Sequence, residues 1–187
     1  MNIDIHRTLS ELQTKLNSRD LHAAFSLSTK LRSQLIGVIY EEEFGFGNRE
    51  SELPANIAQG EVSGEIVTLT INEPLPSMKE LTASMQDYWL ELIHIAIEKA
   101  LQGQKLPYFN KAFVWIEITT PKYSDNAMLW DTSNRAINLI INNLKGTFFE
   151  DDNHEHMAFG VVGKWGEEGK TVVKIMSFER FKELISN

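Results

Sequence analysis

Apolar residues recur at helical spacing in the N-terminal part of the chain. They fall on one face of each of two successive segments, Leu9, Leu12 and Leu16 in the first and Leu21, Phe25, Leu31, Leu35 and Val38 in the second. Ser18 or Asp20 is suited to cap the second segment, because a short polar side chain accepts a hydrogen bond from the first helical turn. The pattern predicts a helical hairpin over residues 3–43.

The next stretch, EEEFGFGNRESELPANIAQGE, has no sustained period. It is polar and contains three glycines and a proline, a composition typical of linkers and surface loops. We therefore place a domain boundary near residue 60. Residues 1–60 form the hairpin and linker, and residues 61–187 form the main domain.

The main domain opens with a change of period. In EIVTLTINEPLPS, the apolar residues Val67, Leu69 and Ile71 alternate with polar ones and two prolines follow, which predicts a half-buried strand. The stretch LTASMQDYWLELIHIAIEKAL has one apolar face and predicts a helix over residues 81–101. The stretch KAFVWIEITTP predicts a second strand over residues 111–121, ended by its proline.

A second helix, two strands and a final short helix complete the domain. The segment DTSNRAINLIINNLKG has capping residues from Asp131 to Ser133, an apolar stripe and a stop at Gly146, so it predicts a helix. The runs HMAFGVVGKW and TVVKIMSF, joined by GEEG, predict a β-hairpin, and FERFKELI predicts a final short helix. This order predicts an α+β fold, with a mixed, mainly antiparallel sheet covered by helices.

Two of the four tryptophans fall at positions that predict burial. Trp89 lies on the apolar face of its helix, and Trp115 lies in the strand KAFVWIEITTP. Trp130 stands beside Asp131, where an aromatic ring can stack on a nucleic-acid base. The tryptophans therefore indicate mainly a core, with one of them close to candidate chemistry.

Composition excludes several kinds of chemistry. The chain has no cysteine, which excludes disulfides, thiolate zinc sites and a cysteine nucleophile and fits a reducing cytoplasm. It shows neither a secretory leader nor a run of about 18 apolar residues, so we expect a soluble cytoplasmic protein with no membrane partner.

The net charge of −8 argues against a broad electropositive face but is compatible with carboxylates gathered around metal ions. Phosphate-binding glycine loops and the G-x-S-x-G motif are both missing.

The most acidic part of the chain is FFEDDNHEHMAFG, in which four carboxylates and two histidines lie between Glu150 and His156. Carboxylate oxygens suit Mg²⁺, which hydrolyses phosphodiesters by activating water and neutralising charge. The candidate metal ligands are Asp125, Asp131, Asp151 and Asp152. They can meet if the loop after the second helix folds back along it, and Lys122 or Arg135 can then stabilise charge on the phosphate.

Other interpretations of these residues stay open. His154 and His156 alternate at strand spacing and can point to one face, so with Asp152 they can hold zinc, manganese or nickel. Alternatively, the acidic pair is a solvated turn and Asp131 only a helix cap.

The order of elements and several motifs together resemble the RusA-type Holliday-junction resolvases over about residues 62–176. The motifs are LPS after the first strand, a proline at the end of the second, NLKG at the end of the second helix, and an aromatic pair followed by EDD. The resemblance implies a homodimer that cuts four-way DNA junctions with magnesium. Manganese can take the place of magnesium at such a carboxylate site. Asp151 and Asp152 match the family's acidic pair. Without gaps, Asn134 and Asn138 stand where the family has the aspartate of the helix head and a lysine one turn later; with a small insertion in the helix, Asp131 and Arg135 take these two positions.

Two functions follow from these observations. The first is a metal-dependent, structure-selective DNA endonuclease of DNA recombination and repair, with Asp131, Asp151, Asp152 and Arg135 as catalytic residues. The second is a noncatalytic, dimeric DNA-associated or protein-interaction module that keeps the fold with a degenerate metal site. In either case the apolar stripe of the N-terminal hairpin can cover the sheet, pair between subunits or bind a protein partner.

Overall fold

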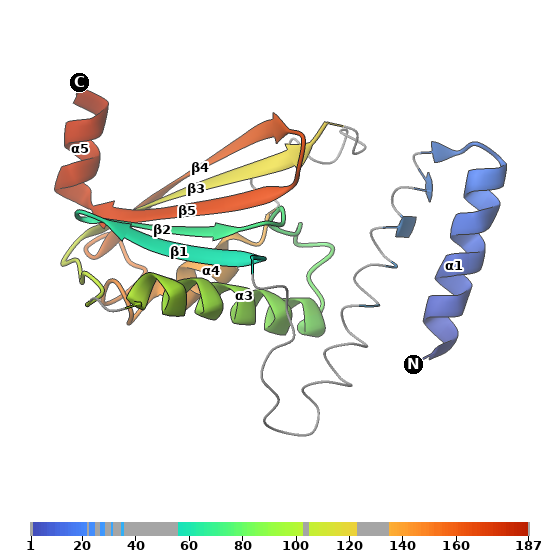
Figure 1. Cartoon of the computed structure of the whole chain (residues 1–187), viewed down its shortest axis with the longest axis horizontal. Coiled ribbons are helices and arrows are strands. Elements are labelled where there is room, and N and C mark those ends of the chain that lie inside the picture. The colour runs from blue at the N-terminus through green and yellow to red at the C-terminus, as the bar shows by residue number, and fades with distance from the viewer. Residues whose placement is uncertain are drawn as a thin grey trace.

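The computed structural model describes residues 2–21, 23–24, 27–28, 31, 35, 56–102, 105–122 and 135–186. Its first element is helix α1 (Asn2–Asn17), drawn apart from the sheet in Figure 1. Asp20 accepts a hydrogen bond from the backbone N–H of Ala23 at 3.2 Å, so it is the cap of the next segment. Those residues of that segment that the structure describes are helical, but much of the predicted hairpin lies outside the described residues and stays a prediction.

A five-stranded sheet forms the centre of the main domain, in the order β1-β2-β5-β3-β4. Its strands are β1 (Ala58–Ser63), β2 (Ile66–Ile71), β3 (Ala112–Pro121), β4 (Met157–Gly166) and β5 (Lys170–Ser177). β3 and β4 are parallel, and the other neighbouring pairs are antiparallel. The predicted α+β class and the mixed, mainly antiparallel sheet are therefore confirmed.

β1 is a strand that the sequence analysis did not predict, and it runs across the proposed boundary near residue 60. Its first residues had been assigned to the linker because that stretch is polar, contains three glycines and a proline, and has no sustained period. Gly60 explains its packing: a Cβ there would lie 1.8 Å from the carbonyl oxygen of Ala96 in the facing helix. A residue without a side chain lets the strand approach the helix backbone this closely.

The predicted hairpin of β4 and β5 is wrong. β5 lies between β2 and β3, so β3 separates it from β4 (Figure 1). The glycines of GEEG are needed because the connection lies very close to two side chains. A Cβ at Gly166 would lie 2.3 Å from Thr119 Cγ2, and a Cβ at Gly169 would lie 2.5 Å from Pro74 Cδ. The connection therefore crosses the end of β3 and packs against neighbouring chain.

Two helices pack under one face of the sheet. Helix α3 (Ala83–Leu101) is capped by Thr82, whose hydroxyl accepts a hydrogen bond from the N–H of Met85 at 3.2 Å, and it buries Trp89 as predicted. Helix α4 (Ile137–Leu144) lies beside it. The core between these helices and the sheet includes Val67, Leu69, Ile71, Leu92, Val114, Ile116, Ile140, Leu144, Phe148 and Phe149.

Helix α4 starts later than the sequence predicted. Its N-cap is Ala136, with no capping side chain, and the predicted capping residues from Asp131 to Ser133 lie outside the described residues. The N–H of Ala136 instead donates to the carbonyl of Pro76 at 3.0 Å, and Arg135 forms an isolated bridge with Ser77. The chain therefore pairs with the β2–α3 connection just before α4, and the N–H of Ile137 donates back to the carbonyl of Arg135 at 2.8 Å. The predicted stop is confirmed, because Gly146 has a φ of 77°.

Helix α5 (Phe178–Ser186) packs on the opposite face of the sheet, at one end. The ring of Phe181 stacks on Phe113 of β3, with centroids 3.5 Å apart and planes 6° apart. Phe113 and Trp115 share this face, whereas Val114 points into the core. Trp115 is half-buried, which corrects its prediction as a core residue.

Within the described ranges, no helix is long and apolar enough to cross a membrane.

Candidate functional site

The acidic loop is built on two buried aromatic residues. After α4 ends, the N–H of Gly146 donates to the carbonyl of Phe149 at 2.7 Å, which closes a tight turn. The side chains of Phe148 and Phe149 are fully buried, and the carbonyl of Phe148 accepts from the N–H of Phe109 at 2.8 Å. Because this turn is packed into the core, the carboxylates that follow it are brought back beside the end of the helix.

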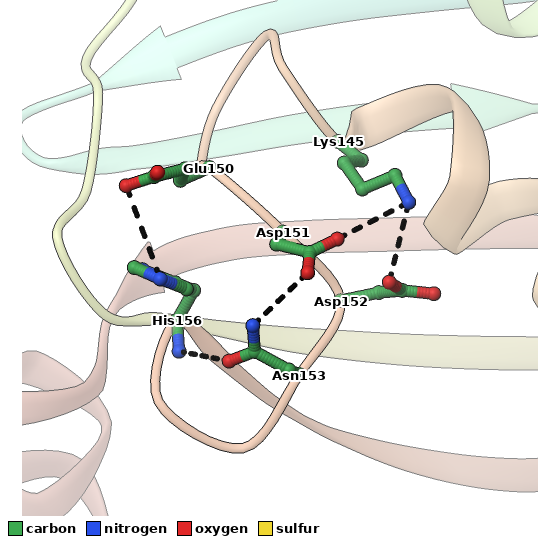
Figure 2. Close-up of polar contacts among 6 residues, drawn as sticks. All are labelled: Lys145, Glu150, Asp151, Asp152, Asn153 and His156. Atoms are coloured by element: carbon green, nitrogen blue, oxygen red, sulfur yellow. Dashed lines mark hydrogen bonds and ion pairs between the residues drawn. The ribbon is translucent and has the colours of Figure 1, made fainter.

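Lys145 holds the predicted acidic pair together (Figure 2). Its ammonium nitrogen lies 3.2 Å from Oδ1 of Asp151 and 3.3 Å from Oδ1 of Asp152. All three side chains are well exposed to solvent. The two carboxylates therefore converge on one cationic position, which the chain fills with its own lysine.

The charges of this cluster stabilise one another. Hydrogen bonds from Lys145, the largest cause, and from Asp152 and Asn153 together lower the pKa of Asp151 from 3.8 to about 2. The same contacts raise the pKa of Lys145, the hydrogen bond with Asp151 being the largest cause. Both groups are therefore charged near neutral pH, and the pair attracts cations less than two free carboxylates would.

Asn153 links the acidic pair to the start of β4. Its Nδ2 donates to Oδ2 of Asp151 at 3.0 Å, and its Oδ1 accepts from the N–H of Glu155 at 2.9 Å. Its carbonyl also accepts from the N–H of Met157, the first residue of β4, at 3.0 Å. Asp151 is thus oriented by a loop fixed at both ends, by the buried aromatic pair and by the parallel strand.

The histidine alternative is not supported by the geometry. Nε2 of His156 lies 3.9 Å from Oε2 of Glu150 rather than against Asp152, and His154 is exposed. Within the part of the chain that the structure describes, no three His, Asp or Glu side chains are grouped so that they could hold a metal ion. His154, His156 and Asp152 accordingly do not form a metal site in this conformation.

Arg135, predicted as a catalytic cation, is buried under the β2–α3 connection. Only 6% of it is exposed, and its Nη1 donates to the carbonyl of Leu75 at 2.7 Å. Burial lowers the pKa of Arg135, and the nearby charge of Glu80 raises it. Oε2 of Glu80 in turn accepts from the N–H and the hydroxyl of Ser77, each at 2.9 Å. Arg135 is therefore placed to hold the LPS turn against the start of α4.

The donor set can be compared with the needs of magnesium. Mg²⁺ prefers hard oxygen ligands and keeps several waters, so the converging oxygens of Asp151 and Asp152 are suitable donors. Asp125 and Asp131, the other predicted ligands, lie outside the described residues. The described residues thus supply two carboxylates, and an incoming cation must displace Lys145.

Lys145 is the functional residue that sequence reasoning missed. It had been noted only within NLKG, as part of the helix end. The available signal was the glycine after it, because a left-handed turn at Gly146 reverses the chain and brings a lysine back toward acids six and seven residues later. Lys122, the other predicted cation, is exposed at the end of β3.

Comparisons of the chain with protein-family models, with curated proteins and with solved structures found no significant match. The RusA-type resemblance therefore stays a prediction that depends on the sequence motifs. Function has to be argued from the geometry of Lys145, Asp151 and Asp152.

Proposed function

We propose that the chain is a metal-dependent, structure-selective DNA endonuclease of the junction-resolving type. The observation that carries the proposal is the convergence of Asp151 and Asp152 on one cationic position beside the end of α4. The NLKG and EDD motifs, which resemble those of RusA-type resolvases, surround this same position. Branched DNA is the proposed substrate, a homodimer the proposed active form, and a reducing cytoplasm the proposed location.

The proposed chemistry assigns a role to each side chain. When bound, Mg²⁺ or Mn²⁺ supplies an activated water and neutralises the scissile phosphate. Asp151 and Asp152 would hold it, joined by Asp131 and Asp125. Lys145, once displaced from the pair, is then free to contact the phosphate. Arg135 would act by positioning the turn at Ser77 rather than by touching the substrate.

The second candidate function is a noncatalytic, dimeric DNA-associated or protein-interaction module with the same fold. It is supported by Lys145, which already neutralises the acidic pair, and by the burial of Arg135 away from a substrate phosphate. In that case the acidic loop is a structural remnant of a metal site, stabilised internally by its lysine.

Cleavage of a labelled synthetic four-way junction separates the two functions. The wild type is compared with Asp151→Asn and with Glu150→Gln in magnesium, in manganese and in EDTA, with linear duplex of matched sequence as a control. Glu150 is the matched control because its carboxylate is exposed and contacts His156 rather than Lys145. The nuclease proposal predicts metal-dependent cutting that Asp151→Asn abolishes and Glu150→Gln retains. Absence of cutting by the folded wild type in both metals would favour the noncatalytic module.

A further inference from the structure

The face of the sheet opposite α3 and α4 carries a second set of aromatic and charged side chains. We call it the open face and define it by Thr68 and Thr70 of β2, Phe113, Trp115 and Glu117 of β3, Gly160 and Lys164 of β4, and Lys170, Val172 and Lys174 of β5. Among the described helices, α5 is the one that packs on this face, and it covers one end (Figure 1). Antiparallel sheets commonly leave such a face to solvent, and polar threonines are ordinary there.

A row of stacked aromatic rings on the open face is unusual for a sheet surface that faces solvent. Phe181 of α5 stacks on Phe113, and Phe113 stacks on Trp115 with centroids 6.5 Å apart and planes 29° apart. The indole of Trp115 fills the space above Gly160, where a Cβ would lie 3.2 Å from its ring atoms. Trp115 is half-buried, so this fixed ring still presents part of its surface to solvent. Because the ring is already fixed, little conformational entropy is lost when a second flat ring stacks on it.

Cations stand beside this row. Lys174 is the cross-strand neighbour of Trp115, and Lys170 points to the same face four residues away, about 13 Å along the strand. Both side chains are exposed, and neither takes part in any ion pair among the described residues. Lys111 and Lys182 flank the other end, with ammonium groups 5.1 Å and 4.9 Å from the ring centroid of Phe178. These lysines are concentrated around the aromatic row although the whole chain has a net charge of −8.

We propose that the open face binds single-stranded nucleic acid, with an unpaired base on Trp115 and backbone phosphates on Lys174 and Lys170. Stacking platforms with nearby cations bind single strands without sequence preference, because every base has a π-face and every nucleotide a phosphate. In a duplex the faces of the bases are stacked on one another, and the grooves are too narrow for a broad sheet. A single strand therefore fits this surface better than a duplex does. The proposal goes beyond nuclease function, because it uses none of the residues of the acidic loop.

Fluorescence anisotropy of a labelled oligothymidylate, about 12 nucleotides long, tests the proposal on the full chain. The variants are Lys174→Glu and Trp115→Leu, and the matched control is Lys79→Glu, an exposed lysine in the turn between β2 and α3. We expect about a tenfold loss of affinity or more for each open-face variant, little change for Lys79→Glu, and affinity that falls as salt rises. Thermal unfolding establishes whether each variant is folded.

A second readout guards against misfolding of Trp115→Leu. The readout is the quenching of intrinsic tryptophan fluorescence when the oligothymidylate is added. Trp115→Phe keeps an aromatic ring, so it should retain binding, but it should lose the part of this quenching that arises from Trp115. Equal loss in Lys174→Glu and Lys79→Glu would overturn the proposal, as would absence of binding by the wild type at low salt. A change in tryptophan fluorescence with protein concentration alone that the wild type shows and Trp115→Phe lacks would also overturn it, because the open face would then be a contact between two copies of the chain.

Discussion

Replacing Lys145 with glutamine removes the cation that holds the acidic pair. In the wild type its ammonium lies 3.2 Å from Asp151 and 3.3 Å from Asp152, and its hydrogen bond is the largest cause of the lowered pKa of Asp151. We expect the pKa of Asp151 in Lys145→Gln to rise from about 2 part of the way toward its ordinary 3.8, because the largest of the causes that lower it is removed. The hydrogen bonds of Asn153 and of the backbone N–H of Asp152 remain in this variant and limit the rise.

The pKa is measured by following the side-chain carboxyl carbon of Asp151 by NMR across the acidic range. Glu150→Gln is the control, because Glu150 does not contact Asp151, and this variant should leave the pKa near its wild-type value. A pKa of Asp151 that stays at about 2 in Lys145→Gln would refute the assignment of the lowering to Lys145.

The same contact predicts a pH dependence of folding stability. The folded pKa of Asp151 is lower than its ordinary value, so its stabilising contribution is present above about pH 3.8 and is lost as the pH falls through about 2. The pKa of Lys145 is raised, so its contribution is present below 10.5 and is lost as the pH rises above that value. The melting temperatures of the wild type and Lys145→Gln should therefore differ between these limits and converge below about pH 2. Because the cluster is exposed, added salt should reduce the difference.

Two further variants test the packing that positions the site. Gly60→Ala places a Cβ 1.8 Å from the carbonyl oxygen of Ala96, so we expect a loss of about 1–3 kcal/mol in the free energy of unfolding, measured in urea, and an unchanged value would contradict the close approach of β1 and α3. Phe149→Ala empties a fully buried site beneath the acidic loop, so we expect a loss of about 3–5 kcal/mol, together with broadened amide signals at Asp151 and Asp152. Sharp, unshifted signals in that variant would show that the aromatic pair does not position the carboxylates.

Local patterns predicted most of the secondary structure. The alternation of Val67, Leu69 and Ile71 and the apolar face around Trp89 both correspond to elements whose one side is buried in the core. Such patterns arise from the geometry of a single element, so they can be read without knowing its neighbours. The stop at Gly146 is likewise a local effect, because it depends on the backbone conformation of one residue.

Strand order could not be predicted in the same way. The glycines of GEEG are typical of a hairpin turn, but they are required where Gly166 approaches Thr119 and Gly169 approaches Pro74. β1 was missed for a related reason, since Gly60 is explained only by the backbone of α3 that lies against it. In each case the residue type is set by a neighbour distant in sequence, and a single sequence does not identify that neighbour.

The candidate site was predicted in part. Asp151 and Asp152 were recognised from their spacing and from the motifs around them, and the structure places them together. Their partner Lys145 was missed because the contact depends on the reversal of the chain at Gly146. The prediction that Arg135 faces a substrate phosphate was wrong for a different reason: its burial depends on the β2–α3 connection, which lies far away in the sequence.

Binding of Mn²⁺ to the acidic pair, measured by paramagnetic broadening of backbone amide signals, tests the central claim most directly. We predict that substoichiometric Mn²⁺ broadens the signals of Asp151, Asp152 and Asn153 first in the wild type, more strongly in Lys145→Gln, and not in Asp151→Asn. Broadening that is no stronger at these residues than elsewhere, or that persists unchanged in Asp151→Asn, would contradict the claim that the pair is a cation site.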